Sequence, residues 1–373
     1  MNILALEPYH GGSHKAFLDG WQQHSRHAWT VLGLNPNKWK WRMRHAAVTF
    51  AAEIGKRVAK GEQWDLVFCS DMLNLAEFLG LTRDALHGCP AVAYFHENQL
   101  TYPFQHPDER DYQFVFTNIT TALAANAVWF NSQYHLDEFL AALPAFYRQM
   151  PDYRPHETVA QIRQKSSVQP QGIAALVARP PRPPGPIRIL WAARWEYDKD
   201  PDMFFEALRL LRARGLAFRL HVLGQQFRQS PPVFAQAEQE FKAQIDTWGY
   251  QPSRAAYRAV LARADVAVST AQHEFFGIGI AEAAVAGAFP LVPRRLAYPE
   301  VLAADEPGHD RFFYEGGAPE LADALAHLAR KLEHGDLWDG DPELARRIVQ
   351  RYTWPELAPR LDAALETAAA NPG

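Results

Sequence analysis

Short apolar runs of strand length alternate along the chain with longer segments in which apolar residues recur at helical spacing. In the first half we expect strands at residues 3–6, 29–32, 66–70, 91–95 and 127–131, with helices at 46–60 and 114–126. In the second half we expect strands at 187–193, 218–224, 266–270 and 289–292, with helices at 201–214, 233–247 and 253–262. This alternation predicts an α/β fold in which parallel sheets have helices on both faces.

A proline-rich segment interrupts the alternation between residues 166 and 186. Proline has no backbone N–H and disrupts helices and central strands, so this segment is predicted to be an interdomain linker. We therefore expect a first domain over residues 1–165 and a second over residues 187–350. Residues 351–373 have the pattern of a capped amphipathic helix.

The bulk properties limit the classes of partner. A chain of 373 residues suits two domains, and its net charge of −4 gives no overall attraction for a polyanion, so any nucleic-acid surface must be a local patch. Cys69 and Cys89 stand in strand-like contexts, which favours buried free thiols over a disulfide or a metal site. With no secretion signal and no apolar run of membrane-spanning length, we expect a cytoplasmic protein without a membrane partner.

Two glutamates flank a glycine-containing turn in the second half. Glu274 follows the expected strand 266–270, and Glu282 comes after seven intervening residues, at the start of a predicted helix. Ligands of open α/β sheets bind beyond the carboxyl ends of the strands, and N–H groups at a helix start suit a diphosphate. Carboxylates accept hydrogen bonds, so the pair suits the hydroxyls of a sugar and a ribose. The alternative is an ordinary strand–loop–helix unit with exposed acids.

Two further loops contain groups that suit an anionic ligand. Arg194 and Lys199 follow the first strand of the second half and could hold a diphosphate, although a solvated basic loop is the alternative. Gly11, Gly12 and Ser13 follow the first strand of the chain, and paired glycines allow close approach of the backbone to a ligand. A tight structural turn explains these glycines equally well.

Four polar residues, His96, Glu97, Asn98 and Gln99, follow the expected strand 91–95. His96 could donate to a sugar hydroxyl, and the others could orient an acceptor. A histidine that only stabilises the fold is the alternative for His96.

The most unusual local composition is the run from residue 38 to residue 44, where Lys38, Lys40, Arg42 and Arg44 alternate with tryptophans. Such cations can contact phosphates while aromatic rings stack on bases. A membrane-surface patch and a helix with core tryptophans are the alternatives. A second basic stretch could extend the surface; it contains Arg148, Arg154, Arg163, Lys165, Arg179 and Arg182.

Several segments, in order along the chain, resemble those of one known family. They are Tyr9-His-Gly-Gly-Ser-His-Lys15, Lys38-Trp-Lys-Trp-Arg42, Phe95-His-Glu-Asn-Gln-Leu100, Glu109-Arg-Asp-Tyr-Gln113, Pro151-Asp-Tyr-Arg-Pro155, Arg194-Trp-Glu-Tyr-Asp-Lys-Asp-Pro201, Trp248-Gly-Tyr250, His273-Glu-Phe-Phe-Gly277 and Tyr298-Pro-Glu300. They are similar to the tRNA-queuosine α-mannosyltransferases, retaining glycosyltransferases of family 4 with the GT-B fold. The spacing of Glu274 and Glu282 matches the E-x7-E signature of such enzymes.

The resemblance implies two Rossmann-like domains with parallel sheets that face each other across a cleft, and a last helix that could cross back to the first domain. It implies transfer of mannose from GDP-mannose to the cyclopentenediol of queuosine in the anticodon of tRNA-Asp. The nucleotide sugar and the tRNA are then the partners, and neither a metal nor a further cofactor is expected. A related glycosyltransferase with a lipid or polysaccharide acceptor and a non-catalytic RNA-binding relative remain alternatives.

The resemblance also implies roles for individual residues. The expected catalytic residues are His96, Arg194, Lys199 and Glu274. The expected donor-binding residues are Gly11, Gly12, Ser13, Arg194, Lys199, Trp248, Gly249, Tyr250, Glu274, Phe275, Phe276, Gly277 and Glu282. The expected acceptor-binding residues are Lys38, Lys40, Arg42, Arg44, Glu97, Asn98 and Gln99.

Overall fold

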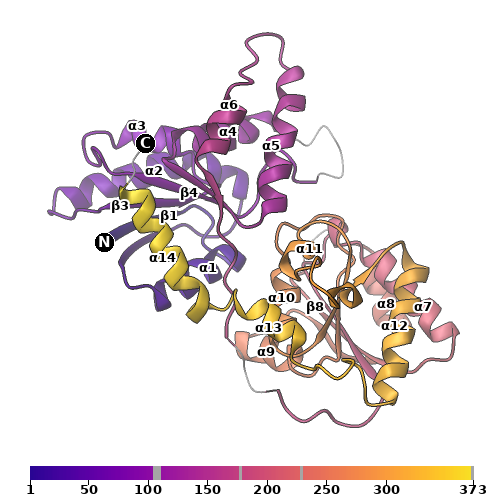
Figure 1. Cartoon of the computed structure of the whole chain (residues 1–373). Coiled ribbons are helices and arrows are strands. Elements are labelled where there is room, and N and C mark those ends of the chain that lie inside the picture. Colours follow the sequence, from indigo (N-terminus) through magenta and orange to yellow (C-terminus); the bar gives the residue numbers. More distant parts are fainter. Residues whose placement is uncertain (104–110, 176–178, 227–229, 371–373) are drawn as a thin grey trace. The chain divides into compact units, whose positions relative to one another are not determined.

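The computed structural model describes residues 1–103, 111–175, 179–226 and 230–370 (Figure 1). The chain divides into two compact units, each with its own parallel six-stranded sheet. Unit 1 consists of Met1–Gly172 together with Trp354–Gly373, and unit 2 consists of Ile173–Thr353. The predicted α/β fold with parallel sheets is confirmed. Within the described ranges, no helix combines the length and the apolar character that a membrane span needs.

The sheet of unit 1 has the strand order β2-β1-β3-β4-β5-β6. Its strands are β1 (Asn2–Glu7), β2 (Ala28–Gly33), β3 (Leu66–Ser70), β4 (Ala91–Phe95), β5 (Ala127–Phe130) and β6 (Ser166–Val168). The direction in which strands are added reverses between β1 and β3. Ligands of open α/β sheets bind at such a switch point, beyond the carboxyl ends of the strands.

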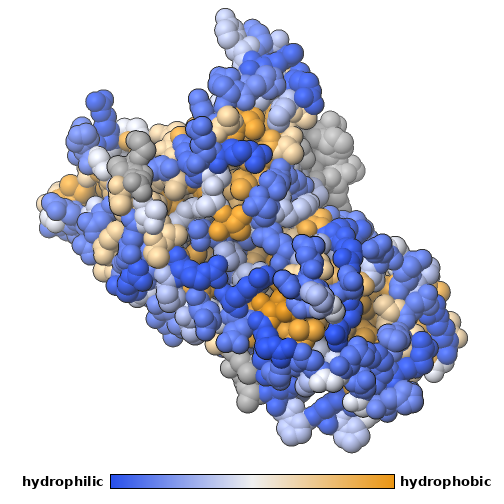
Figure 2. All heavy atoms as spheres, in the orientation of Figure 1, coloured by the Kyte–Doolittle hydropathy of each residue, from blue (hydrophilic) through white to orange (hydrophobic). Residues whose placement is uncertain are grey.

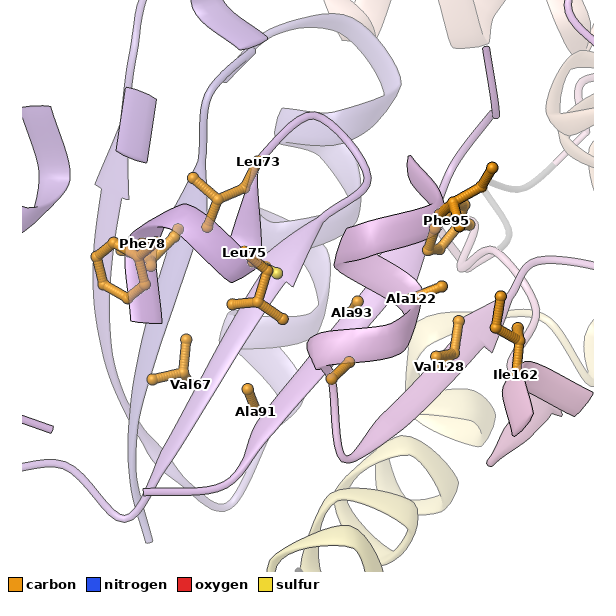
Figure 3. Packing of buried hydrophobic residues seen from close by; sticks show 14 of the residues in the cluster. Val67, Leu73, Leu75, Phe78, Ala91, Ala93, Phe95, Ala122, Val128 and Ile162 are labelled. Atoms are coloured by element: carbon orange, nitrogen blue, oxygen red, sulfur yellow. The ribbon is translucent and has the colours of Figure 1, made fainter. Parts of the chain in front are cut away.

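Helices cover both faces of this sheet, which explains why its central strands β1, β3, β4 and β5 are mostly apolar. They are α1 (Gly12–His24), α2 (Trp39–Val58), α3 (Leu75–Leu81), α4 (Tyr112–Ala124), α5 (Gln133–Arg148), α6 (Thr158–Gln164) and α14 (Trp354–Ala370). Alternate residues of β4 face opposite sides: Ala91, Ala93 and Phe95 join a core with α2 to α6, whereas Val92 and Tyr94 join a core with α1 and α14. Figure 3 shows part of the first core between the sheet and its helices.

The last helix, α14, packs on the first sheet and thus belongs to unit 1. Its first residue, Trp354, occupies space that two glycines leave open, because a Cβ on Gly20 or Gly172 would lie 2.1 or 2.3 Å from the indole. The buried Asp362 carboxylate then accepts hydrogen bonds from Trp21 Nε1, Ser25 Oγ and the Arg26 N–H, each at 2.8 Å. The apolar contacts of Trp354 and the hydrogen bonds of Asp362 together fix α14 on α1.

The sheet of unit 2 has the order β12-β11-β10-β7-β8-β9, so its switch point lies between β10 and β7. Its strands are β7 (Ile187–Ala192), β8 (Phe218–Leu223), β9 (Ile245–Gly249), β10 (Val266–Val268), β11 (Phe289–Pro293) and β12 (Phe313–Tyr314). Its α-helices are α7 (Pro201–Ala213), α8 (Val233–Glu240), α9 (Arg254–Leu261), α10 (Ile278–Val285), α11 (Tyr298–Val301), α12 (Ala318–Glu333) and α13 (Leu344–Gln350). Two 3₁₀ helices complete the unit, η2 (Tyr197–Lys199) and η3 (His309–Phe312).

Several predicted boundaries differ from the structure. Ser166–Val168, which we assigned to the linker, forms β6 at the edge of the first sheet. The helix expected over 233–247 ends at Glu240, and β9 follows it. The helix expected from residue 46 begins at Trp39. β6 and β9 are strands because each pairs with a neighbouring strand. Short polar sequences do not reveal such pairing.

The proline-rich segment is bound to unit 2 through one buried carboxylate. Arg182 donates from Nε and from one terminal nitrogen to the two Asp265 oxygens, at 2.8 and 3.0 Å. The Arg188 N–H donates to the same carboxylate at 2.9 Å, and the Arg179 guanidinium lies 3.6 Å from it. Because Asp265 precedes β10, the segment is fixed along the amino end of this sheet. Arg179 and Arg182, which we had counted in a second basic surface, are therefore bound to Asp265 within unit 2.

The first prediction concerns α14. Replacing Trp354 by Ala should lower the stability of the protein by about 3–5 kcal/mol, because the loss of a buried indole leaves a cavity. Thermal unfolding measures the effect. Glu366→Ala is the matched control on the same helix, since the Glu366 side chain is 45% exposed and pairs with Arg26 and His27 outside the apolar core. Equal melting temperatures for the two variants would contradict the anchoring role of Trp354.

Candidate active site

The loops after β7 and β10, two neighbouring strands, meet at the carboxyl edge of the sheet of unit 2. The first loop forms η2, which contains Lys199, and the second contains Glu274. Backbone contacts join them: the Thr270 hydroxyl donates to the Lys199 carbonyl at 2.8 Å, and the Gln272 N–H donates to the Asp198 carbonyl at 2.8 Å. Two residues that the sequence places far apart are thereby held together.

The Lys199 ammonium is buried among three oxygen acceptors. Its Nζ donates to the His273 carbonyl at 2.6 Å and lies 3.0 Å from Asp198 Oδ2 and 3.4 Å from Glu274 Oε2. An ammonium has three protons, so these contacts can use all of them. The longest contact, to Glu274, is the one that a phosphate oxygen could replace at the least cost.

The same contacts determine the charges of the pair. Burial alone would lower the pKa of Lys199, but the Glu274 and Asp198 carboxylates raise it above its ordinary value. Burial alone would raise the pKa of Glu274, but the Lys199 cation holds it below its ordinary value. Both groups are therefore ionised at neutral pH. Glu274 is an acceptor beside a fixed positive charge, which suits a sugar hydroxyl next to a diphosphate.

A hollow of about 300 Å³ lies beside this pair, lined by Lys199, Glu274, Gly277, Gly279 and Tyr298 among others. The two glycines are required here: a Cβ on Gly277, whose φ is 90°, would lie 2.6 Å from the Tyr298 ring, and one on Gly279 would lie 2.6 Å from the Ala192 carbonyl oxygen. Helix α10 begins directly after Gly277 without a capping side chain. Its first N–H groups suit an anion such as a diphosphate.

Glu282 lies on α10, 9% exposed, with Arg254 Nη1 at 3.4 Å from its carboxylate. Burial raises its pKa, against the opposing effects of the Arg254 cation and of a hydrogen bond with Tyr257. A second hollow, of about 320 Å³, lies between α9 and α10 and is lined by Glu282, Arg258 and Ala174 among others. The structure thus places the two glutamates of the predicted signature at different hollows of the same unit.

The remaining donor candidates of unit 2 differ in exposure. Arg194 is exposed, with Nε 3.2 Å from Glu196 Oε2. Trp248 and Gly249 end β9, and Trp248 packs at 5.3 Å against Trp195, so its ring belongs mainly to the core. Tyr250, which follows, is 71% exposed and remains the more accessible candidate for contact with a base.

Two phenylalanines of the predicted donor loop face inward. Phe275 and Phe276 are 4% and 2% exposed, so only their backbone groups are available to a ligand. The Phe276 N–H lies 3.5 Å from Glu274 Oε1 and helps to orient that carboxylate.

At the switch point of unit 1, a buried ion pair lies against His96. His14 Nδ1 donates to Glu7 Oε2 at 3.1 Å, and Glu7 Oε1 also accepts from the Tyr9 N–H and from Ser70 Oγ. The His14 ring stacks on His96 with 4.0 Å between ring centroids. Burial alone would lower the pKa of His14, but Glu7 raises it to about 9, so His14 is a cation at neutral pH.

The tautomer of His96 is set by a residue that sequence analysis did not single out. Gln171 Nε2 donates to His96 Nδ1 at 2.7 Å. An amide nitrogen can only donate, so Nδ1 is the acceptor and the proton of the neutral ring is on Nε2. Burial and the neighbouring His14 charge hold the pKa of His96 well below its ordinary value. His96 can therefore donate one hydrogen bond from Nε2 to a sugar or phosphate oxygen.

The same cluster contains a further buried acid, Asp71, whose Oδ1 accepts from the His96 N–H at 2.9 Å. Burial raises the pKa of Asp71 to about 8, against the effect of the His14 cation. Glu7, His14 and His96 also have potential ligand atoms within 4.8 Å of one another, which is compatible with a metal ion. Their hydrogen bonds to one another and to Gln171 already account for the arrangement, and the absence of a metal from the reaction stays a prediction.

The glycines after β1 have separate roles. A Cβ on Gly11 would lie 2.4 Å from Pro36, so packing alone requires this glycine. Gly12, with a φ of 53°, begins α1 and is exposed, as is Ser13. Gly12 and Ser13 are therefore the accessible members of the predicted donor loop in unit 1.

Of the polar residues after β4, only Glu97 is partly exposed. Asn98 is fully buried, and its Oδ1 accepts from the Leu100 and Thr101 N–H groups. Gln99 is 3% exposed, and its N–H donates to Asn118 Oδ1 at 2.7 Å. In this structure Asn98 and Gln99 stabilise the loop, and Glu97 is the accessible candidate for contact with an acceptor.

The basic run at the start of α2 is largely accessible. Lys38, Lys40 and Arg44 are exposed, whereas Arg42 is half-buried and donates to the Asn35 carbonyl and to Asn37 Oδ1. Of the matching segment 109–113, residues Glu109 and Arg110 lie outside the described residues.

Sequence reasoning missed Gln171, Asp71, Asp198 and Tyr257. Gln171 stands in a stretch that we assigned to the linker, where no periodicity marks it. Asp71 and Asp198 follow strands, as the chosen candidates do, and this position was the available signal.

Each half of the chain matches a known protein family. Residues 2–173 match the family model described as "tRNA-queuosine alpha-mannosyltransferase N-terminal", and residues 174–351 match "Glycosyl transferases group 1". A tRNA-queuosine alpha-mannosyltransferase from Drosophila melanogaster is 33% identical over 312 residues, which cover 80% of this chain and 81% of the relative. A GDP-mannose-dependent alpha-(1-6)-phosphatidylinositol dimannoside mannosyltransferase from Mycobacterium tuberculosis is 28% identical over 50% of this chain and 46% of its own length.

Solved structures resemble the fold at low sequence identity. A sucrose-phosphate synthase from Thermosynechococcus elongatus is 15% identical, with a TM-score of 0.71 over 99% of this chain and all of its own. The Anabaena protein HepE in complex with UDP-glucose is also 15% identical, with a TM-score of 0.65 over 98% of this chain and all of its own. These likenesses support the GT-B fold. Because this chain is 33% identical to the Drosophila relative and its own residues 2–173 match the amino-terminal family model, it belongs to the tRNA-queuosine alpha-mannosyltransferase family.

Proposed function

We propose that this protein is a retaining hexosyltransferase that moves mannose from GDP-mannose to the cyclopentenediol of queuosine in the anticodon of tRNA-Asp. The observation that carries the proposal is the match of residues 2–173 to a domain specific to tRNA-queuosine mannosyltransferases. Glycosyltransferase domains such as residues 174–351 occur with many acceptors, so the amino-terminal half is the more specific part. We propose a cytoplasmic location, with which a tRNA acceptor is compatible.

Lys199 and the start of α10 support the chemistry of a diphosphate leaving group. In the proposed step, the bond between the anomeric carbon and the diphosphate oxygen breaks, and its electron pair stays on that oxygen. The queuosine hydroxyl oxygen forms the new bond on the same face of the sugar, and its proton passes to the leaving phosphate. The products are GDP and mannosylated queuosine.

Negative charge on the leaving diphosphate grows as this bond breaks. The buried Lys199 cation and the N–H groups at the start of α10 are already oriented, so they can stabilise this charge without reorganisation. Binding of a phosphate oxygen would replace the 3.4 Å contact between Lys199 and Glu274. Glu274 is then free to accept a hydrogen bond from a hydroxyl of the transferred mannose.

In unit 1, His96 supplies a donor from Nε2, because Gln171 occupies its Nδ1. We assign this N–H to a hydroxyl of the mannose or to a phosphate oxygen. In unit 2, Glu282 suits the ribose hydroxyls, and the exposed Tyr250 suits the guanine base. The choice of GDP-mannose is supported by the name of the mycobacterial relative, which is GDP-mannose-dependent and matches half of this chain.

The decisive experiment is incubation of the protein with GDP-mannose and tRNA that contains queuosine, followed by mass spectrometry of the nucleosides. A hexose added to queuosine is expected. Queuosine without a hexose, under conditions in which GDP is released, would indicate a different acceptor. No GDP release and no hexose would support a non-catalytic relative.

The second prediction separates ground-state binding from catalysis. Glu282→Ala should raise KM for the nucleotide sugar roughly tenfold with little change in kcat, since a charged hydrogen bond to the ribose is present in both states. Lys199→Ala should lower kcat by about 10²–10³, because its charge acts mainly on the leaving group. Steady-state kinetics measure both effects.

The exposed Arg194 provides the control for folding in this comparison. Arg194→Ala removes an exposed cation whose partner Glu196 is itself partly exposed, whereas Lys199→Ala removes a buried cation that pairs with both Asp198 and Glu274. It should lower kcat with an unchanged melting temperature. Normal kcat in both cation variants would refute the assigned leaving-group role.

The third prediction concerns the donor. GDP-mannose should raise the melting temperature more than UDP-glucose at the same concentration, because a ligand that binds only the native state stabilises it by mass action. Glu282→Ala should reduce the shift that GDP-mannose causes. An equal or larger shift with UDP-glucose would exclude guanosine selectivity.

A further inference from the structure

Three segments that lie far apart in the sequence form one side of unit 1. The start of α2 contacts the start of α4: the rings of Trp39 and Phe114 lie 5.1 Å apart, and the Arg44 guanidinium lies 4.9 Å from the Phe114 ring. Arg44 also lies 3.4 Å from the Asp111 carboxylate. Because Trp39 and Phe114 hold the two helix starts together, the surface that carries the basic run on α2 adjoins the start of α4.

The same side continues from α4 to the end of α5. The Tyr112 ring lies 5.6 Å from Phe146, and its hydroxyl donates to Gln149 Oε1 at 3.0 Å. Phe116 lies 5.3 Å from Phe146. Beyond Gln149 the chain enters the loop between α5 and α6, which contains Tyr153 and projects from unit 1 in Figure 1. In Figure 2, white and orange surface lies among blue side chains in the part of unit 1 where α4 and α6 overlap in Figure 1.

These three segments expose aromatic rings and cations. Trp41 is 61% exposed, Tyr112 48% and Tyr153 95%, and Tyr153 is held at a φ of 46°, which non-glycine residues rarely adopt. The exposed cations Lys38, Lys40 and Arg154 lie on the same segments. We call these six residues, Lys38, Lys40, Trp41, Tyr112, Tyr153 and Arg154, the aromatic–cationic face. Exposed rings that gather on adjoining segments are candidates for contact with a partner.

Among the other cations of the second basic stretch, Lys165, Arg179 and Arg182 bind groups of the protein itself, whereas Arg163 is exposed on α6. Lys165 donates to the Leu123 and Ala125 carbonyls, and Arg163 lies 4.0 Å from Asp137. Arg179 and Arg182 bind Asp265 in unit 2. Only Arg148 and Arg154 of that stretch lie on this side of unit 1, so the positive charge concentrates where the rings are exposed.

We propose that the aromatic–cationic face binds the unpaired bases of an RNA loop. Trp41, Tyr112 and Tyr153 would stack on bases, while Lys38, Lys40 and Arg154 would contact phosphates. A chain with a net charge of −4 needs such a concentrated patch to hold a polyanion. Rings separated by cations suit a chain of alternating bases and phosphates better than a continuous apolar surface. The assignment of that loop to the tRNA anticodon rests on the proposed function.

Tyr153→Ala is the most direct test, since this side chain is almost fully exposed and its loss should leave the fold intact. The full-length protein is titrated with an RNA hairpin that has an unpaired loop and with a fully paired RNA of equal charge. Tyr153→Ala should weaken hairpin binding about tenfold, and binding of the paired RNA should hardly change. Tyr153→Trp, which keeps a stacking ring, should restore the affinity for the hairpin.

The cations are tested by the salt dependence of binding. Lys38→Ser with Lys40→Ser should weaken binding of both RNAs and make the salt slope shallower by about one for each cation removed. Lys56→Ser is the matched control, because Lys56 is a 72% exposed lysine near the other end of α2, beside Glu53. Tyr153→Ala should leave the salt slope unchanged, which distinguishes stacking from charge.

Unchanged hairpin affinity in Tyr153→Ala, or an equal loss for the paired RNA, would overturn the proposal. So would a double lysine variant that loses binding to anionic phospholipid vesicles but not to RNA, since the partner would then be a membrane. These results are separate from the transfer assay. A wild-type protein that binds the hairpin through this face but adds no hexose to queuosine would refute the proposed function alone.

Discussion

The buried ammonium of Lys199 is the contact on which the site of unit 2 depends. A buried charge is costly unless it is paired, and this one is paired by groups from both loops at the switch point of the sheet. Lys199 therefore fixes the relative position of η2 and the Glu274 loop and also keeps Glu274 ionised. Positioning and charge come from the same contact, so the site is already organised before any ligand arrives.

Unit 1 also has an ion pair at the switch point of its sheet, formed by different residues. At its switch point a buried carboxylate, Glu7, holds a cation, His14, and this cation keeps the stacked His96 neutral. In both units a buried ion pair at the carboxyl edge of the sheet determines the state of the neighbouring polar group. In unit 1 the cation keeps His96 a neutral hydrogen-bond donor, and in unit 2 the cation keeps its own partner Glu274 an acceptor.

The sequence predicted the central strands because they are buried on both faces, and continuous apolar runs mark them. The missed strands β6, β9 and β12 are all edge strands, short or partly polar, and their pairing depends on a neighbour that no local pattern reveals. Site positions such as Glu274 were predictable because parallel strands end at one edge. The partners of these positions were not: the contacts of Gln171 with His96 and of Arg182 with Asp265 span 75 and 83 residues without any spacing rule.

The return of α14 to the first sheet has a consequence for synthesis on the ribosome. Domains commonly fold in order as they emerge, the amino-terminal one first. Here residues 354–370 complete the core around Trp21 and Phe17, so one face of the first sheet is covered only by α1 until the whole of unit 2 has been translated. Unit 2 is continuous in sequence and can finish folding earlier. The half that was made first is thus completed last, and until then its exposed apolar face is open to chaperones and to aggregation.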